Sequence, residues 1–417
     1  MVLESFIGWI DLEPKDLSRA RDYLRKLEEG TIDELGFGII RDSFSEDFFP
    51  ATSTVMTIAR QYLFVPFFCI HIESRMVKEK NWDTRRAMSE VYDMENHLRD
   101  CVSIIRKEKV KRLPSIIYWP ALRKLKIFRG GHSISSYFRK VKEAADRSFR
   151  DDDGMAHLDR EGLGFWDPEI VRLYFKEKNF IEDDRLQFAD PRDIKKNGEL
   201  TVAEARYLQA VYRGHQLTEK SSIMSYLLDK EMDKEFTFPW DSPCPSELKA
   251  KVEESRRFSM LVAGARLVYY RMIIGERSAR GLPDIQAPDY SELFSAWWNW
   301  AHEELSTWDV RQFFETKREA LRSSRKDTEF ISGFCSGLHR YHRSQAFFNA
   351  GEIRSLIAER ERVVRPQKSR LRNPKYLEQW KPHDIDISAP GFAFGLDYRA
   401  GIASKLTREI ILGLRRR

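Results

Sequence analysis

The chain has 417 residues, with 71 basic and 65 acidic side chains, so its formal net charge is +6 at pH 7. This length exceeds what one hydrophobic core usually serves and predicts two or three packed units. The apolar fraction of 42% and the aromatic fraction of 12% exclude an intrinsically disordered chain, and the charged fraction of 33% predicts a heavily charged surface.

Helical periodicity dominates the first 150 residues. Apolar side chains recur about every 3.6 positions in four segments, at 14–29, 39–49, 84–109 and 133–148. The apolar stretch 55–72 is predicted to be a core helix that kinks or ends near Pro66, because proline lacks the N–H donor that a helix needs. Polar residues interrupt this stretch too often for a bilayer span. Prolines and glycines make 113–131 loop-like around a short helix at 120–126.

The rest of the chain is also predicted to be helical. Acidic, glycine-bearing residues at 150–164 mark a first boundary, and three prolines mark a linker at 238–245. Thr201 and Glu204 have the spacing of a capping box at a helix start. Helices are expected at 168–178, 201–212, 221–233, 246–277, 290–302, 309–323, 329–347 and 351–361. The predicted fold is therefore mainly α and multi-helical, with few short strands and with helical units at 1–150, 165–238 and 246–417.

The spacing of the cysteines and the residues at the start of the chain indicate in which cellular compartment the protein is expected. Cys69, Cys101, Cys244 and Cys335 are far apart, which argues against a disulfide framework or a zinc site and predicts reduced thiols. Residues 1–11 lack the basic region and apolar run of a signal peptide. We therefore expect a cytoplasmic protein without a membrane span.

Basic residues concentrate in one segment, 353–381, which contains nine basic and three acidic side chains. Such an excess can neutralise phosphates and release counterions, and a nearby tryptophan can stack on a base. The alternative is a solvated helix face whose arginines pair with carboxylates elsewhere in the fold. A second basic stretch lies at 106–126. The candidate nucleic-acid contacts are Arg365, Lys368, Arg370, Arg372, Lys375 and Trp380.

No catalytic signature is present. The sequence contains no GxxxxGK[ST], GxGxxG or GxSxG motif, so neither ATP nor a dinucleotide is expected as a cofactor. His339 and His342 could face one metal ion, but no nearby carboxylate or cysteine completes a ligand set. The acidic runs at 151–153 and 182–184 are predicted to be exposed loops. We therefore predict no metal, no cofactor and no catalytic residue.

Two further features have structural interpretations. Four tryptophans, Trp297, Trp298, Trp300 and Trp308, are spaced to pack a core or a partner interface. Arg60 lies within an apolar stretch, where an unpaired guanidinium would be costly. Its predicted partner is Asp42, Glu46 or Asp47.

Several stretches carry a family resemblance. They are residues 6–11 (FIGWID), 34–44 (ELGFGIIRDSF), 49–54 (FPATST), 59–66 (ARQYLFVP), 118–123 (YWPALR), 370–374 (RLRNP) and 396–403 (LDYRAGIA). Together they resemble a bacterial family catalogued as domain of unknown function 6361. Ala51 departs from the pattern, because the family would place glycine in a tight turn there.

The resemblance implies a place in mobile defence loci, near helicases, phospholipase-D-like nucleases or DNA methylases. It assigns no catalytic residue. The motif positions combine charged groups with hydroxyls, which suits a polar network as well as a ligand site. These positions are Arg41, Asp42, Thr54, Arg60, Asp397, Tyr398 and Arg399.

Three hypotheses follow. The first is a non-enzymatic accessory component of a bacterial anti-phage defence system, which binds nucleic acid or a partner subunit through basic and aromatic helical surfaces. DNA and the helicase, nuclease or methylase products of the same locus are its candidate partners. The alternative is a metal-dependent nuclease or other hydrolase, with a site assembled from Arg41, Asp42, Arg60 and Asp397. The third is a scaffold without nucleic-acid contact.

Overall fold

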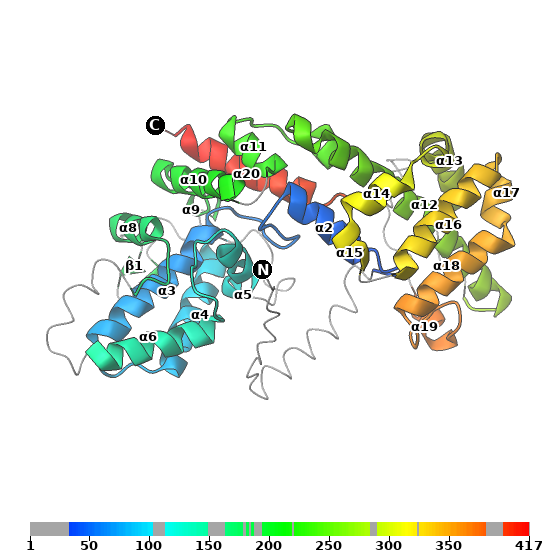
Figure 1. The fold of residues 1–417 in the computed structure, drawn as a ribbon. Helices are drawn as coiled ribbons and strands as arrows, with labels where there is room; N and C mark the ends of the chain where they lie inside the picture. Colours follow the sequence, from blue (N-terminus) through cyan, green and yellow to red (C-terminus); the bar gives the residue numbers. More distant parts are fainter. Residues whose placement is uncertain are drawn as a thin grey trace. The chain divides into compact units, whose positions relative to one another are not determined.

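The computed structural model describes most of the chain as helices joined by short connections (Figure 1). Within the described residues, strands are limited to β1 (Ile181–Glu182), paired antiparallel with β2 (Arg185–Leu186). The prediction of a mainly α fold is therefore confirmed. The described residues are 33–102, 113–148, 163–177, 181–182, 185–186, 194–218, 221–283, 290–322, 325–380 and 395–416.

Two compact units form, and each combines segments that are distant in sequence. The larger unit contains residues 41–259 and 395–417, and the smaller unit contains residues 1–40 and 260–394. Parts of the sequence-based predictions lie outside the described residues, namely the helix at 14–29, the motif at 6–11, the acidic run at 151–153 and most of the boundary at 150–164.

The larger unit is built around α3 (Gln61–Lys78), whose residues from Gln61 to Ile70 are all buried. Helices α4, α5, α6 and α8 pack against it. The helices of this unit are α2 (Gly38–Phe48, which begins in the smaller unit), α4 (Thr84–Val102), α5 (Pro114–Lys124), α6 (Ile134–Ser148), α8 (Pro168–Glu177), α9 (Ile194–Asn197), α10 (Val202–Thr218), α11 (Ile223–Asp229), the 3-10 turns η2 (Pro239–Asp241) and η3 (Ser246–Leu248), and α20 (Ala400–Leu414).

Helix α3 corrects one prediction. It begins at Gln61 rather than near 55, and it does not end at Pro66 but continues to Lys78. Pro66 removes one backbone hydrogen bond. The side chains of Phe64, Phe67 and Phe68 are completely buried, and this burial outweighs the lost bond.

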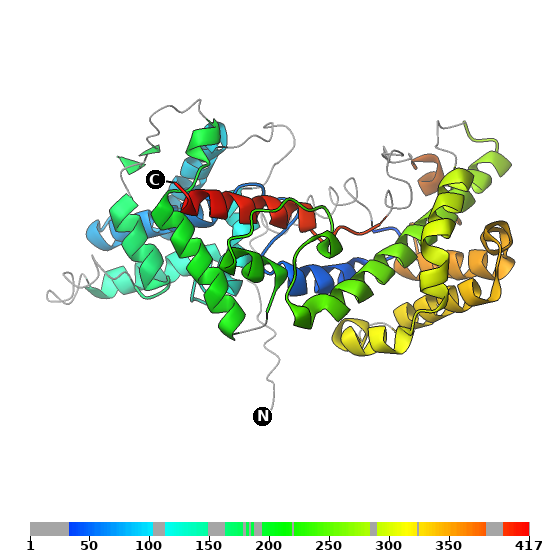
Figure 2. The ribbon, with the colours of Figure 1, turned by 90° about the horizontal axis from the view of Figure 1, so that it is seen from above.

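Helix α20 lies along α10 and α11 (Figure 2). The contact is close at Gly413, where a Cβ atom would lie 2.8 Å from the Cβ of Ala205 and 3.0 Å from that of Leu200. Only glycine fits there without displacing a neighbour. This helix was not among those predicted from the sequence.

The smaller unit has an aromatic core. The rings of Phe294 and Phe348 stack with centroids 3.9 Å apart, and Trp297 Nε1 donates to the Met260 carbonyl at 2.8 Å. Trp297, Trp298 and Trp308 are buried, as the packing interpretation expects. The helices of this unit are the second part of α12 (Lys249–Ala279), α13 (Tyr290–Ser306), α14 (Val310–Thr316), α15 (Arg318–Arg322), α16 (Arg325–Arg340), α17 (Ser344–Asn349), α18 (Gly351–Val364) and α19 (Pro374–Glu378).

One helix of the described residues, spanning 246–279, is long and apolar enough to cross a membrane by length and composition. The protein itself buries 72% of its most apolar window. Such burial is typical of a core helix in a globular unit.

Candidate functional site

The basic segment 353–381 supplies several side chains to the interior of the smaller unit. Arg360 is 4% exposed, forms an ion pair with Asp327, and donates to the carbonyls of Leu35 at 2.6 Å and Gly36 at 2.9 Å. Arg370 is 6% exposed and forms an ion pair with Glu34. The interpretation of arginines paired with carboxylates elsewhere in the fold therefore describes these two residues.

The RLRNP stretch at 370–374 surrounds a buried carboxylate. Glu361 accepts hydrogen bonds from the Tyr269 hydroxyl at 2.6 Å, the Ser369 hydroxyl at 2.6 Å and the Arg370 backbone N–H at 2.7 Å. Asn373 then caps α19 by accepting from the backbone N–H of Lys375 at 3.1 Å. This family-like stretch thus fixes the chain between α18 and α19.

The other predicted nucleic-acid contacts differ in exposure. Trp380 is 3% exposed, and its ring packs against Tyr270 with centroids 5.6 Å apart, so it presents no free face for a base. Arg365 and Lys368 are half-buried, whereas Arg372 and Lys375 are exposed. Only part of the predicted set can therefore meet a phosphate.

Three motif residues of the larger unit converge. The Arg399 guanidinium donates to the Thr52 carbonyl at 2.6 Å and lies 3.2 Å from Asp42 Oδ1 and 3.7 Å from a Glu46 oxygen. Arg41 Nε donates to the same Asp42 oxygen at 3.0 Å. We call Arg41, Asp42, Glu46 and Arg399 the Arg399 cluster.

The LDYRAGIA stretch holds this cluster in a strained turn. Tyr398 and Arg399 both have left-handed backbone conformations, with φ of 54° and 66°. Burial compensates for the strain, because the Tyr398 side chain is completely buried and its hydroxyl donates to the Ser255 carbonyl at 2.6 Å. Asp397 supports the turn by accepting from the Arg399 backbone N–H at 3.2 Å.

Ala51 forms the turn that the family pattern gives to glycine. Its φ is 61°, a conformation that favours glycine. Its backbone N–H donates to Glu46 at 3.0 Å, and its carbonyl accepts from the Tyr62 hydroxyl at 2.6 Å. The turn is therefore present with alanine. Thr54 is exposed and makes no contact with the Arg399 cluster among the described interactions.

Arg60 does not join this cluster, and its predicted partners were wrong. It is the residue that precedes α3, and its side chain pairs with Glu204 at 3.0 Å and donates to the Asn197 carbonyl at 2.9 Å. Glu204 also closes the predicted capping box, which is confirmed by reciprocal bonds with Thr201 at 2.8 and 3.2 Å. One buried carboxylate thus stabilises a helix start and neutralises an arginine 144 positions earlier.

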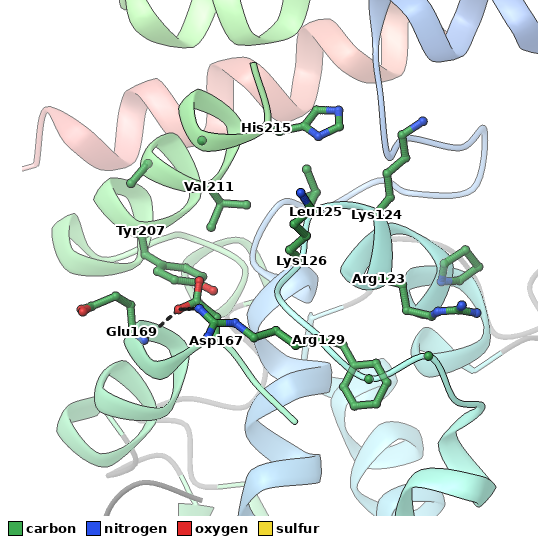
Figure 3. Close-up of a pocket in the computed structure, with 16 residues that line it drawn as sticks. Arg123, Lys124, Leu125, Lys126, Arg129, Asp167, Glu169, Tyr207, Val211 and His215 are labelled. Carbon is green, nitrogen blue, oxygen red and sulfur yellow. Dashed lines mark hydrogen bonds and ion pairs between the residues drawn. The ribbon is translucent and has the colours of Figure 1, made fainter. Parts of the chain in front are cut away.

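A cavity of about 980 Å³ opens in the larger unit (Figure 3). Its walls are the end of α5 with the loop that follows, the start of α8, and the middle of α10. The loop is fixed by backbone bonds from Arg129 N–H to the Phe165 carbonyl at 2.7 Å and from Asp167 N–H to the Ile127 carbonyl at 2.9 Å. The lining includes four basic side chains, Arg123, Lys124, Lys126 and Arg129, and two acidic ones, Asp167 and Glu169.

Some of the charged side chains that line the cavity already form ion pairs. Arg129 lies 3.5 Å from Asp167, and Lys124 lies 2.5 Å from Glu46 of the Arg399 cluster. Arg123 is exposed and has no ion pair among the described residues. Two carboxylates and four cations leave the lining with a positive balance.

Tyr207 projects from α10 into the cavity beside Asp167 (Figure 3). Its side chain is buried, with 9% exposure of the residue, and its hydroxyl makes no hydrogen bond that meets geometric criteria. Burial, followed by the charge of Asp167, raises the pKa of Tyr207 well above its usual value. The hydroxyl therefore keeps its proton at neutral pH and can donate it to a ligand.

This cavity was not predicted from the sequence. The basic stretch 106–126 contains Arg123, Lys124 and Lys126, but nothing in it shows that α10 and the start of α8 complete a pocket. Within the described residues, no group of three or more histidine, cysteine, aspartate or glutamate side chains is placed to hold a metal ion.

The comparisons with known proteins concern the first third of the chain. Residues 4–153 match the model of DUF6361, a family of unknown function. The match includes the basic residues that line the cavity and ends before Tyr207 and Arg399. No curated protein and no solved structure gave a significant match.

Proposed function

We propose that this protein is a non-enzymatic component that binds nucleic acid, and that the cavity of the larger unit holds the phosphate groups. One observation carries the proposal, namely four basic side chains gathered on a cavity of about 980 Å³. Contacts between basic side chains and phosphates supply most of the sequence-independent affinity of nucleic-acid-binding proteins.

The ion pairs of the lining can be exchanged for contacts with a phosphate. Lys124 and Arg129 now pair with carboxylates, and a phosphate oxygen can replace those carboxylates as the acceptor. Arg123 is exposed, so its guanidinium can meet a phosphate without breaking an ion pair. Binding of this kind weakens steeply as salt rises, because it releases condensed counterions.

The biological setting belongs to the same proposal. The family resemblance supports an accessory role in a bacterial anti-phage defence system, in the cytoplasm and beside a helicase, nuclease or methylase. Co-purification of the chain with the products of neighbouring genes tests this setting. The absence of any such partner in the purified material would contradict it.

Charge reversal tests the binding proposal. We expect the double variant Arg123→Glu, Lys126→Glu to bind a labelled oligonucleotide at least about tenfold more weakly than the wild type at low salt. Fluorescence anisotropy measures the affinity, and circular dichroism shows whether the variant is folded.

The matched control is Arg85→Glu with Arg147→Glu, which reverses two exposed charges on α4 and α6 outside the cavity lining. Its affinity should stay within about threefold of the wild type, because surface charges distant from the contact act only through the screened field. Equal losses in both variants, or no binding by the wild type at low salt, would refute the proposal.

A further inference from the structure

We infer that the cavity accepts one unpaired nucleotide, so that the protein prefers single strands and strand ends to uninterrupted duplex. The inference rests on the proposed function and specifies its ligand. It follows from the size of the cavity, the nature of its lining and the unsatisfied hydroxyl of Tyr207.

The size of the cavity suits one nucleotide. At about 980 Å³ it lies within the range of pockets that enclose small ligands. The bases of an intact duplex stay stacked and offer only their edges in the grooves. A base can enter a pocket of this kind only after it has left the stack, and it leaves most easily where it has no partner strand.

The lining combines apolar and cationic side chains. Pro120 on α5 and Val211 on α10 offer apolar surface to a base. The cations Arg123 and Lys126 belong to the α5 wall and the loop that follows it, where they can meet a phosphate. A nucleotide likewise combines a flat ring with a charged phosphate.

The polar pair Tyr207 and Asp167 matches the edge of a base. The Asp167 carboxylate accepts from the backbone N–H of Glu169 at 3.0 Å and retains capacity for another donor, such as an exocyclic amino group. The Tyr207 hydroxyl is buried beside the Asp167 carboxylate without a hydrogen bond of good geometry. A ligand acceptor in the cavity can give this hydroxyl a well-formed bond.

Three labelled probes of one sequence test the inference, namely a single strand, a blunt duplex and a duplex with a single-stranded overhang. We expect the single strand and the overhang to bind at least about tenfold more tightly than the blunt duplex, because one base buried against apolar side chains adds affinity that the duplex cannot gain. Equal affinity for all three probes would overturn the inference and leave the proposed function standing. No binding to any probe would refute the proposed function itself.

Two variants test whether the cavity is the origin of the preference for single strands. Tyr207→Phe removes only the hydroxyl and should weaken single-strand binding about fivefold without changing duplex binding. Val211→Trp places a bulky side chain on the α10 wall, where it obstructs the proposed base position, and should reduce the preference for the single strand. The matched control Tyr92→Phe changes an exposed tyrosine on α4 and should have no effect. If both cavity variants keep the full preference, the nucleotide does not enter this cavity.

Discussion

The basic segment 353–381 and the basic lining of the cavity differ in where their charges lie. Arg360 and Arg370 of the segment are at most 6% exposed and pair with Asp327 and Glu34. In the cavity lining, Arg123 is exposed. The segment has the larger excess of positive charge along the sequence, yet part of that charge stabilises a core.

The chemistry of arginine explains this difference. The guanidinium group offers five donors in a planar fork, so it can join a buried carboxylate and several backbone carbonyls at once. Arg360 makes such a set of contacts with Asp327, Leu35 and Gly36. A high local density of arginine therefore indicates either a phosphate-binding surface or an internal network, and exposure decides between them.

The largest expected effect is on stability in the basic segment. We expect Arg370→Ala to lower the free energy of unfolding by about 3–5 kcal/mol, because it leaves the buried carboxylate of Glu34 without its partner. The neighbouring substitution Arg372→Ala removes an exposed charge and should change stability by less than about 0.5 kcal/mol. Urea denaturation of both variants measures the difference. If Arg370→Ala and Arg372→Ala both change the free energy of unfolding by less than about 0.5 kcal/mol, Arg370 does not stabilise the fold.

The second prediction concerns the half-buried Arg60 of the larger unit and its buried partner Glu204. Glu204→Gln keeps a side chain that can accept in the capping box but removes the carboxylate that pairs with Arg60. We expect a loss of about 3 kcal/mol in the free energy of unfolding. Glu204→Ala should cost about 1 kcal/mol more, because the cap is also lost. If the glutamine variant is as stable as the wild type, the ion pair contributes nothing and the capping role alone accounts for Glu204.

The smallest expected effect is a gain in stability near the Arg399 cluster. Ala51 has a φ of 61°, and the left-handed conformation costs a residue with a Cβ atom about 1 kcal/mol. Ala51→Gly should therefore raise the free energy of unfolding by about 1 kcal/mol. The control Ala144→Gly lies within α6 and should lower it by about 1 kcal/mol. Differential scanning calorimetry distinguishes the two, and a loss in both variants would show that Ala51 is not strained.

Much of the fold was predictable because it depends on local patterns. The helix at 39–49, the long helix at 246–277 and the capping box at Thr201 each follow from residues within one or two helical turns. The structure places α2 at Gly38–Phe48 and α12 at Lys249–Ala279, close to these predictions. The segments 309–323 and 329–347 were each predicted as one helix, but each forms two shorter ones.

The missed features depend on contacts between distant residues. Arg60 was expected to pair with an acid nearby in sequence, but its partner Glu204 belongs to α10. Arg41, Asp42 and Arg399 were three of the seven motif positions, and the structure brings these three into contact. Nothing local identified the cavity, because its three walls come from α5, α8 and α10. The predicted division at 1–150, 165–238 and 246–417 stays a prediction, since breaks in composition do not show which segments pack together.

One measurement tests the central claim that the cavity, rather than the segment 353–381, binds phosphate. The affinity for a labelled single strand is measured across a salt series for the wild type, for Arg123→Glu with Lys126→Glu, and for Arg372→Glu with Lys375→Glu. We predict that the cavity variant binds at least about tenfold more weakly at low salt and that its logarithmic salt slope falls by about two. The segment variant should keep its affinity within about threefold of the wild type and its slope unchanged. Loss of binding in the segment variant, with full binding in the cavity variant, would contradict the account.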